Sequence, residues 1–197
     1  MAQKSEHHLD TEESITARKQ EIRADMIQRR KAQSPADISA SSRKLSELLF
    51  KQPCFIEAEY IYAYIDCKGE VSTKYIIEEA WRQHKQVAVP KVEGKNLQFY
   101  QLLEYGQLEE GFCHIPEPAK GKAVAWEKAL MIMPGVAFDA SKHRVGYGGG
   151  FYDRYLERHT QHAVLAIAFD YQIVPEFEVQ VTDIMPDFVL TETTVYR

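Results

Sequence analysis

The chain has 197 residues, of which 24 are Lys or Arg and 29 are Asp or Glu, so its formal net charge at pH 7 is −5. Hydrophobic residues make up 45% of the chain, which provides for a packed core and excludes a wholly disordered protein. The mildly acidic balance argues against a protein that mainly coats nucleic acid, although a few local cations could still bind a small polyanion.

No stretch of the sequence reaches the roughly 18 apolar residues that a membrane span needs, and the polar first residues are unlike a secretory signal. The cysteines are Cys54, Cys67 and Cys113, without a Cys-x-x-Cys pair, so neither a disulfide framework nor a zinc ribbon is expected. We therefore expect one domain over residues 11–197, a disordered leader over residues 1–10, and a reducing, cytoplasmic compartment.

Two helices are expected first along the chain. The first begins at Asp10 or Thr11, because Asp10 and Glu13 have the spacing of a capping box. The second begins at Ser34-Pro35, a natural N-cap and first helical residue, and it ends before Pro53. Apolar residues at helical spacing mark the buried faces: Ile15, Ile22 and Met26 in the first helix, and Ile38, Leu45, Leu48 and Leu49 in the second.

From about residue 60 the apolar pattern becomes that of strands separated by helices. Strands are predicted at residues 60–65, 87–89, 97–102, 129–133, 163–169 and 188–191, the last being the final strand. Thr73 should cap a third helix, a further helix should span residues 151–158, Pro90 should end its strand, and residues 104–128 should be irregular. The alternation predicts a Rossmann-like α/β domain whose mostly parallel sheet is flanked by helices, with ligands at the carboxyl ends of the strands.

The strongest functional signal is the run Arg144-Val145-Gly146-Tyr147-Gly148-Gly149-Gly150-Phe151-Tyr152-Asp153, which lies between an apolar strand and a helix. Glycine backbone can approach a ligand closely with its N–H groups, and a helix N-terminus adds partial positive charge. The run therefore predicts a phosphate cradle, with Arg144 as its cation and Asp153 as a ligand for Mg²⁺. The alternative is a flexible glycine turn; no Walker A motif or protein-kinase signature is present.

Other candidates have an ordinary reading beside a functional one. Lys19 and Arg23 stack at i and i+4 beside the apolar stripe of the first helix, and by themselves they fit a solvated basic face better than a cleft. Glu70 follows a strand and could accept hydrogen bonds from a heterocycle, or be a surface turn residue. Asp183 could be a second metal carboxylate, and by itself is more simply a turn former.

The whole pattern resembles the 5-formyltetrahydrofolate cyclo-ligase family, also called methenyltetrahydrofolate synthetase. The resemblance runs from about Arg18 to Thr191, and its most specific part is Pro134-Gly135-Val136-Ala137-Phe138-Asp139 followed by the glycine loop. Further landmarks are Lys19-x-x-x-Arg23, Glu70-Val71-x-Thr73, Val87-x-Val89-Pro90-Lys91, Glu117-Pro118 after Gly111, and Asp183.

The resemblance implies conversion of 5-formyltetrahydrofolate to 5,10-methenyltetrahydrofolate, with hydrolysis of ATP to ADP and phosphate and with Mg²⁺ as cofactor. It implies that ATP is bound by Lys19, Arg23, Arg144, Val145, Gly146, Tyr147, Gly148, Gly149, Gly150, Phe151 and Tyr152. It also implies a folate site of Ile65, Glu70 and residues Tyr147, Gly148, Gly149, Gly150, Phe151 and Tyr152. Asp153 and Asp183 would hold the metal, and Arg144 and Tyr152 would serve catalysis.

Two other classes of function remain open at this point. A non-catalytic protein that stores reduced folate, or senses folate or nucleotide, would keep the pocket and lack a catalytic group. A sugar-phosphate isomerase-like enzyme would use a similar sheet without ATP. In each case the partners are small molecules rather than nucleic acid or membrane, and we expect a monomer or a weak homodimer.

Overall fold

The structure, a computed structural model, describes residues 11–197. Its helices are α1 (Glu12–Lys31), α2 (Pro35–Leu49), α3 (Pro53–Glu57), α4 (Lys74–Arg82) and α5 (Phe151–Leu156). Its longer strands are β1 (Tyr60–Ala63), β2 (Gln86–Glu93), β3 (Asn96–Gln101), β7 (Leu130–Met133), β10 (Ala163–Ile167) and β11 (Phe188–Leu190). Its short strands are β4 (Leu108–Glu110), β5 (Pro116–Pro118), β6 (Ala123–Val124), β8 (Ala137–Phe138), β9 (Arg144–Val145) and β12 (Val195–Tyr196).

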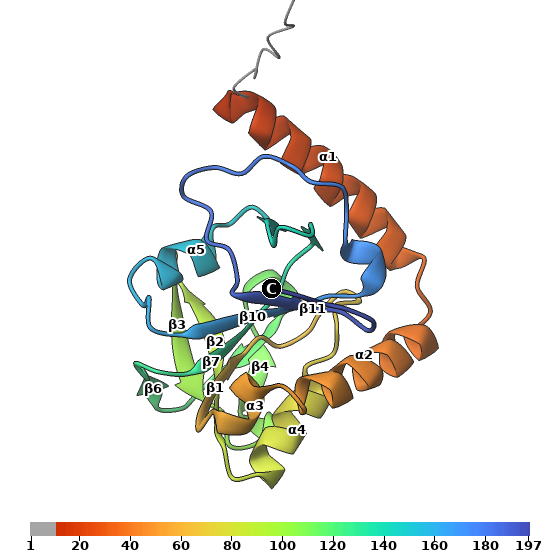
Figure 1. Cartoon of the computed structure of the whole chain (residues 1–197). Coiled ribbons are helices and arrows are strands. Elements are labelled where there is room, and N and C mark those ends of the chain that lie inside the picture. The colour runs from red at the N-terminus through yellow and green to blue at the C-terminus, as the bar shows by residue number, and fades with distance from the viewer. Residues whose placement is uncertain (1–10) are drawn as a thin grey trace, which may run out of the picture.

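One eight-stranded sheet forms the centre of the molecule, in the order β12-β11-β10-β7-β1-β2-β3-β6 (Figure 1). The strands β11, β10, β7, β1 and β2 run parallel, and β12, β3 and β6 run antiparallel at the two edges. The predicted α/β domain with a mostly parallel sheet flanked by helices is thus confirmed.

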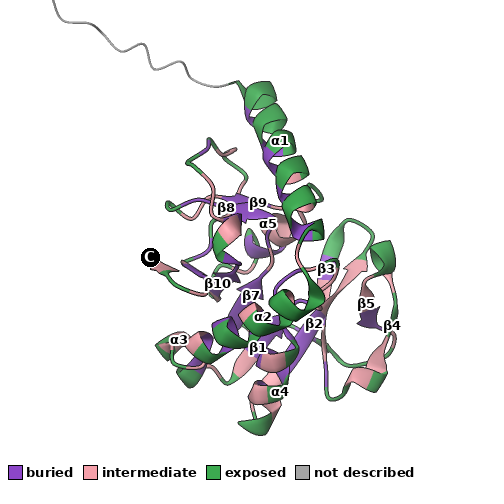
Figure 2. Ribbon diagram, turned by 90° about the vertical axis from the view of Figure 1, so that its right-hand side faces the viewer, coloured by how far each residue is buried: buried purple, intermediate pink, exposed green. Residues whose placement is uncertain are grey.

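Both faces of the sheet are buried, as its central position in Figure 2 shows. Alternate residues of β1 enter two different core clusters. Ile61 and Ala63 pack in the cluster that contains Leu45 of α2 and Ile76 of α4, whereas Tyr62 packs with residues of α5. Burial on both sides explains why the parallel strands read as continuous apolar runs in the sequence.

Helix α1 does not pack on the sheet but on the β8–β9 hairpin. Ile22 and Met26 of the helix form a third cluster with Val136, Ala137 and Val145. The turn of the hairpin is fastened by the buried carboxylate of Asp139, which accepts hydrogen bonds from the backbone N–H and Nδ1 of His143 at 2.9 and 2.8 Å. The hairpin therefore places α1 beside the glycine loop that follows β9.

The helix caps follow the sequence with one difference. Thr11 is the N-cap of α1 and its Oγ1 accepts the N–H of Ser14, while Asp10 lies outside the described residues. Ser34 caps α2 through the N–H of Asp37, as predicted. Thr73 precedes α4 but does not cap it with its side chain, because its hydroxyl donates to the carbonyl of Tyr64 instead.

Three strand predictions need correction. Strand β2 continues through Pro90. Strand β1 pairs with β2 only as far as Ala88, so at Pro90 strand β2 is paired with β3 alone. The N–H group that proline lacks is therefore not needed by β1, and proline is tolerated there. The final strand is β12, which pairs antiparallel with β11. A hairpin, β8–β9, separates the apolar strand β7 from the glycine loop, so that Arg144 lies in a strand.

Candidate active site

A cavity of about 970 Å³ opens where the parallel strands end. Its walls come from the segments that follow β1 and β7, the second half of β2, the glycine loop with α5, the inner face of α1, and the loop around Asp183. The position agrees with the rule that open parallel sheets bind ligands beyond the carboxyl ends of their strands.

Almost all residues singled out in the sequence line this cavity. They are Lys19, Arg23, Ile65, Glu70, Arg144, Gly146, Tyr147, Gly148, Gly149, Gly150, Phe151, Tyr152, Asp153 and Asp183. The exception is Val145, whose side chain is fully buried against Ile22 and Met26 and does not line the cavity. Strand pairing explains this, because adjacent residues of β9 point to opposite sides and Arg144 takes the side that faces the cavity.

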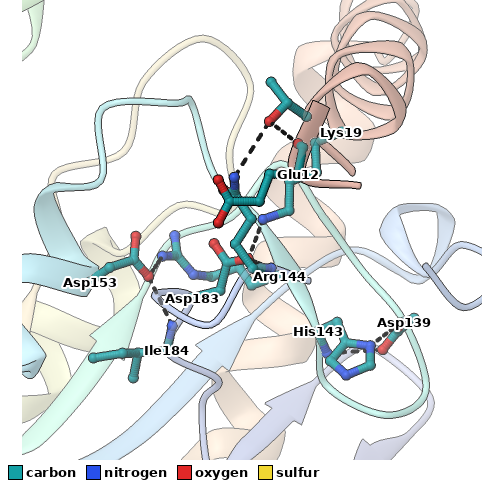
Figure 3. A network of polar contacts seen from close by, with 10 residues as sticks. Glu12, Lys19, Asp139, His143, Arg144, Asp153, Asp183 and Ile184 are labelled. Carbon is teal, nitrogen blue, oxygen red and sulfur yellow. Dashed lines mark hydrogen bonds and ion pairs between the residues drawn. The ribbon is translucent and has the colours of Figure 1, made fainter. Parts of the chain in front are cut away.

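Two cation–carboxylate pairs stand side by side in the cavity wall (Figure 3). Lys19 pairs with Oδ2 of Asp183, and Arg144 pairs with Oδ1 of Asp153 at 2.6 Å. Backbone N–H groups of Gln180 and Ile184 donate to the same two carboxylate oxygens. The loop that carries Asp183 is thereby joined to α1 and α5.

Each of these carboxylates keeps one oxygen free. Within residues 11–197, Oδ2 of Asp153 and Oδ1 of Asp183 accept no hydrogen bond, and Nε of Arg144 is buried without a partner. The same residues contain no ready group of three or more His, Cys, Asp or Glu side chains that could hold a metal. Because Mg²⁺ is usually held by one or two carboxylates together with water and phosphate oxygens, the pair fits it nevertheless.

The glycine loop is fixed to α1 through Arg23. Nε of Arg23 donates to the carbonyl of Gly146 at 2.8 Å. Gly148 has a φ of +95°, and a Cβ added there would lie 3.7 Å from the Arg23 guanidinium. The loop thus has a conformation that suits glycine and leaves its backbone close to the half-buried guanidinium of Arg23.

Glu70 also lines the cavity and is only 6% exposed. Its Oε2 accepts the N–H of Cys67 at 3.0 Å, and its Oε1 accepts the hydroxyl of Tyr147 at 2.8 Å. Burial raises the pKa of this carboxyl, while the hydrogen bonds and the nearby Arg30 oppose the rise. Glu70 is therefore a buried acceptor rather than a surface turn residue.

Sequence reasoning did not single out Arg30, which lies in the last turn of α1. Its side chain is buried, pairs with Glu70 at 4.0 Å, and donates to the hydroxyl of Tyr147 and the carbonyl of Gly135. A signal was present, because Arg30 follows Met26 by four residues on the buried stripe of α1, where Lys19 also lies. A cation at such a position indicates a buried partner.

The segment that had been expected to be irregular supplies the remaining wall. Residues 112–113 and 115–117 line the cavity, and the ring of Phe112 meets that of Phe151 edge-on at 5.9 Å between centroids. Glu117 is buried and accepts the N–H of Val92 at 3.1 Å, which ties this segment to β2. Residues 104–128 are thus less irregular than expected, since they contain β4, β5 and β6, and apart from the landmark Glu117-Pro118 their sequence did not indicate that they would cover a site.

This arrangement can bind a ligand with an anionic end and a polar heterocyclic end. Lys19, Arg23 and Arg144 gather at the glycine loop, and exposed N–H groups of glycine backbone favour phosphate. Glu70 offers carboxylate oxygens to a heterocycle, and the aromatic side chains of Tyr147, Phe151 and Tyr152 line the same cavity. Among the described residues no helix is long and apolar enough to cross a bilayer.

Comparisons with known proteins point to one family. The model of the 5-formyltetrahydrofolate cyclo-ligase family matches residues 15–192. The mouse 5-formyltetrahydrofolate cyclo-ligase is 29% identical over 201 residues, which cover 91% of this chain and 96% of the mouse protein. The Escherichia coli (strain K12) enzyme of the same name is 29% identical over 178 residues, which cover 86% of this chain and 98% of that protein. The solved structure of Aquifex aeolicus 5,10-methenyltetrahydrofolate synthetase has a TM-score of 0.80 and 30% identity, covering 91% of this chain and 92% of the other.

Proposed function

The chain belongs to the 5-formyltetrahydrofolate cyclo-ligase family, and we propose that it converts 5-formyltetrahydrofolate to 5,10-methenyltetrahydrofolate with hydrolysis of ATP to ADP and phosphate. It is an enzyme of the ligase class. The observation that carries the proposal is that one cavity holds both a cationic glycine loop and the buried acceptor Glu70. Storage or sensing of folate would not require the catalytic groups that this cavity retains.

The nucleotide end of the site would be formed by α1 and the glycine loop. Lys19, Arg23 and Arg144 would neutralise the phosphates of ATP, and the backbone of residues 146–150 would contact them closely. Arg144 is the best placed of the three to act on the γ-phosphate, because it lies at the base of the loop with a buried, unpartnered Nε. Val145 would support the loop from the core rather than contact the nucleotide.

Mg²⁺ would be held by Asp153 and Asp183, which keep free oxygens facing the same cavity. When bound, the ion neutralises phosphate charge and orients the phosphates for attack. Asp153 and Asp183 would hold the ion through their free oxygens while their other oxygens are paired with Arg144 and Lys19. Lys19 and Arg144 would thus stand beside both the ion and the phosphates of the nucleotide.

The folate end would be formed by Ile65, Glu70 and the aromatic residues of the glycine loop. Glu70 in its ionised form can accept two hydrogen bonds from N–H groups of the pterin ring, as its two oxygens now do from Cys67 and Tyr147. The ring of Tyr152 is available for stacking or hydrogen bonding beside the reacting atoms, and burial raises the pKa of its hydroxyl, which therefore stays protonated.

The reaction follows from the weakness of a formamide oxygen as a leaving group. The formyl oxygen attacks the γ-phosphorus of ATP, and ADP leaves. N10 of the folate then adds to the activated carbon and loses its proton, and phosphate departs with the former formyl oxygen. The protein contributes by holding both substrates in contact and by stabilising the charge that moves between phosphate oxygens, chiefly through Arg144.

The test is a spectrophotometric assay with 5-formyltetrahydrofolate, ATP and Mg²⁺, in which the near-ultraviolet band of methenyltetrahydrofolate is followed. We expect the band to grow only when ATP is present. Folate binding without growth of the band would favour a storage or sensing protein, and product formation without ATP would exclude the proposed reaction. A cytoplasmic location remains a prediction that cell fractionation can check. A monomer or weak homodimer remains a prediction that analytical ultracentrifugation can check.

A further inference from the structure

Arg30 lies at the junction of four segments that are distant in the sequence. It belongs to the last turn of α1 and its side chain is 4% exposed. One terminal nitrogen pairs with Oε1 of Glu70 at 4.0 Å and donates to the hydroxyl of Tyr147, and the other donates to the carbonyl of Gly135 at 3.2 Å. The guanidinium thus connects α1 to the turn after β1, the turn after β7 and the glycine loop.

The backbone around Glu70 is built to fit the stem of Arg30. Gly69 has a φ of +76°, and a Cβ added there would lie 3.1 Å from Cγ of Arg30. The chain therefore passes close to the arginine immediately before Glu70. Because Arg30 does not line the cavity, its effect on a ligand has to pass through Glu70 and Tyr147, which do.

The charged state of Glu70 depends on few neighbours. Tyr64, which directly follows β1, and Tyr152 of α5 lie near it, Cys67 of its own turn and Tyr147 of the glycine loop are hydrogen-bonded to it, and none of the four carries positive charge. Arg30 is the cation paired with it among the described residues. A buried carboxylate without a cation tends to take up a proton, and the acid then loses the acceptor capacity that two N–H donors need.

We propose that Arg30 is a positioning residue that keeps Glu70 ionised and oriented toward the folate ring and fixes Tyr147 against it. The role in folate binding rests on the function proposed above. It means that the folate end of the cavity depends on a residue of α1 that touches neither substrate, eleven positions beyond the phosphate-binding Lys19.

The variants for the test are Arg30→Gln and Arg30→Lys, with Arg29→Gln as the matched control. Arg29 is the adjacent arginine on the same helix, but it is exposed and paired with Asp25 on the outer face. Circular dichroism and thermal melting establish which variants fold. Calorimetric titration with 5-formyltetrahydrofolate alone, and with ATP and Mg²⁺ alone, is then carried out at several pH values.

We expect Arg30→Gln to weaken folate binding by about tenfold or more near neutral pH and to change nucleotide binding by less than about threefold, as fits the loss of a charged hydrogen-bonding partner. The weakening should diminish as the pH rises, because Glu70 can then ionise without its cation. Arg30→Lys should recover part of the affinity, and Arg29→Gln should match the wild type. Wild-type folate affinity and an unchanged pH profile in Arg30→Gln would overturn the proposal. If that variant does not fold, Arg30→Lys decides, because one ammonium group cannot hold Glu70, Tyr147 and Gly135 together, and wild-type folate affinity in Arg30→Lys would then overturn the proposed positioning role.

A second measurement does not depend on any ligand. The carboxyl carbon of Glu70 can be followed by NMR in protein labelled at glutamate, with Glu70→Gln to assign its signal. We expect its titration to move to higher pH in Arg30→Gln, or in Arg30→Lys to a smaller extent. An unmoved titration would refute the link between Arg30 and Glu70. A moved titration in a protein that binds no folate would instead refute the proposed function and leave that link standing.

Discussion

At the scale of single residues, the cavity wall contains two adjacent ion pairs, each of one cation and one carboxylate. Lys19 and Arg144 are each neutralised by an aspartate that is also expected to hold Mg²⁺. Such half-buried pairs keep the side chains in fixed positions while ligands are absent. If Asp153 and Asp183 hold Mg²⁺ as proposed, nucleotide and metal should bind together, because each would neutralise a charge that the other leaves unpaired.

Arg144→Ala should lower kcat/KM by about 10²–10³-fold, because charge on the transferred phosphoryl group would lose its nearest fixed cation. The fold should persist, since Asp153 keeps the N–H of Ile184 and the cavity admits water to its carboxylate. Steady-state kinetics together with a thermal melt check both points. Arg158→Ala, at an exposed arginine bonded to Asn96, is the control. A folded Arg144→Ala enzyme with near-normal turnover would show that another group stabilises the phosphoryl charge.

Asp153→Asn should raise the Mg²⁺ concentration for half-maximal activity by about tenfold or more, because an amide oxygen binds this hard cation more weakly than a carboxylate oxygen does. A magnesium titration at saturating ATP measures the effect. Asp25→Asn, on the exposed face of α1, provides the comparison. An unchanged titration curve would remove Asp153 from the metal site.

Some site residues could be predicted from the sequence and others could not, for physical reasons. The glycine loop could be found by composition, since backbone that approaches a ligand closely needs glycine. Lys19 and Arg23 could not be separated from a solvated basic face, because a single helix does not reveal what lies against it. Only the resemblance to a family suggested that a nucleotide lies against this face of the helix. Arg30 was overlooked although it lies on the buried stripe, because a guanidinium there is understood only once Glu70 is placed beside it.

At the scale of elements, the β8–β9 hairpin is the unit that organises the site. It carries Arg144, forms the surface on which α1 packs, and leads directly into the glycine loop. Strands of two residues have no periodicity that a sequence pattern can show. The hairpin was therefore unpredictable, and the strand through Pro90 was underestimated because its neighbours were unknown.

Two glycine variants distinguish the effect of ligand contact by the loop backbone from the general effect of backbone strain. Gly148 and Gly94 both have positive φ, at +95° and +61°, but only Gly148 lines the cavity, and Gly94 has open space around it. Alanine at either position should cost about 1 kcal/mol of stability. Only Gly148→Ala should also raise the KM for ATP several-fold, as steady-state kinetics can show. Equal kinetic effects in both variants would indicate that the loop backbone does not contact the nucleotide.

At the scale of the whole molecule, the fold was predictable where burial is two-sided. The parallel strands β1, β7 and β10 and the helices α2 and α4 follow from apolar runs and caps. The edges of the sheet and the wall formed by residues 112–117 were not predictable, because short exposed strands and turns depend on contacts distant in sequence. The cavity itself depends on such contacts, because its lining residues come from segments as distant in the sequence as α1 and the loop at Asp183.

His162 should make the molecule less stable in acid. Its ring is 7% exposed, packs against Tyr62 and Tyr155, and has no hydrogen-bond partner among the described residues. Burial, and to a lesser degree His159, lowers its pKa from 6.5 to about 4. A histidine with a depressed pKa in the folded state contributes stability above its unfolded pKa, and this contribution is lost as the pH falls through the folded pKa.

When the pH is lowered from about 7 to about 4, the free energy of unfolding should fall in both proteins. The fall should be about 1–3 kcal/mol smaller in His162→Phe than in the wild type. Urea unfolding at a series of pH values measures the difference, and His114→Gln, at an exposed histidine, is the control. Parallel pH profiles for wild type and His162→Phe would contradict the assignment of a neutral, buried ring.

The central claim is that one cavity brings the formyl oxygen of the folate to the γ-phosphate of ATP. The most direct measurement is a single turnover with 5-formyltetrahydrofolate labelled with ¹⁸O in the formyl group, followed by mass analysis of the phosphate released. The account predicts that each phosphate formed carries the label, because the C–O bond breaks after the oxygen has joined phosphorus. Formation of methenyltetrahydrofolate with unlabelled phosphate would contradict it, since ATP would then be hydrolysed by water and not by the folate.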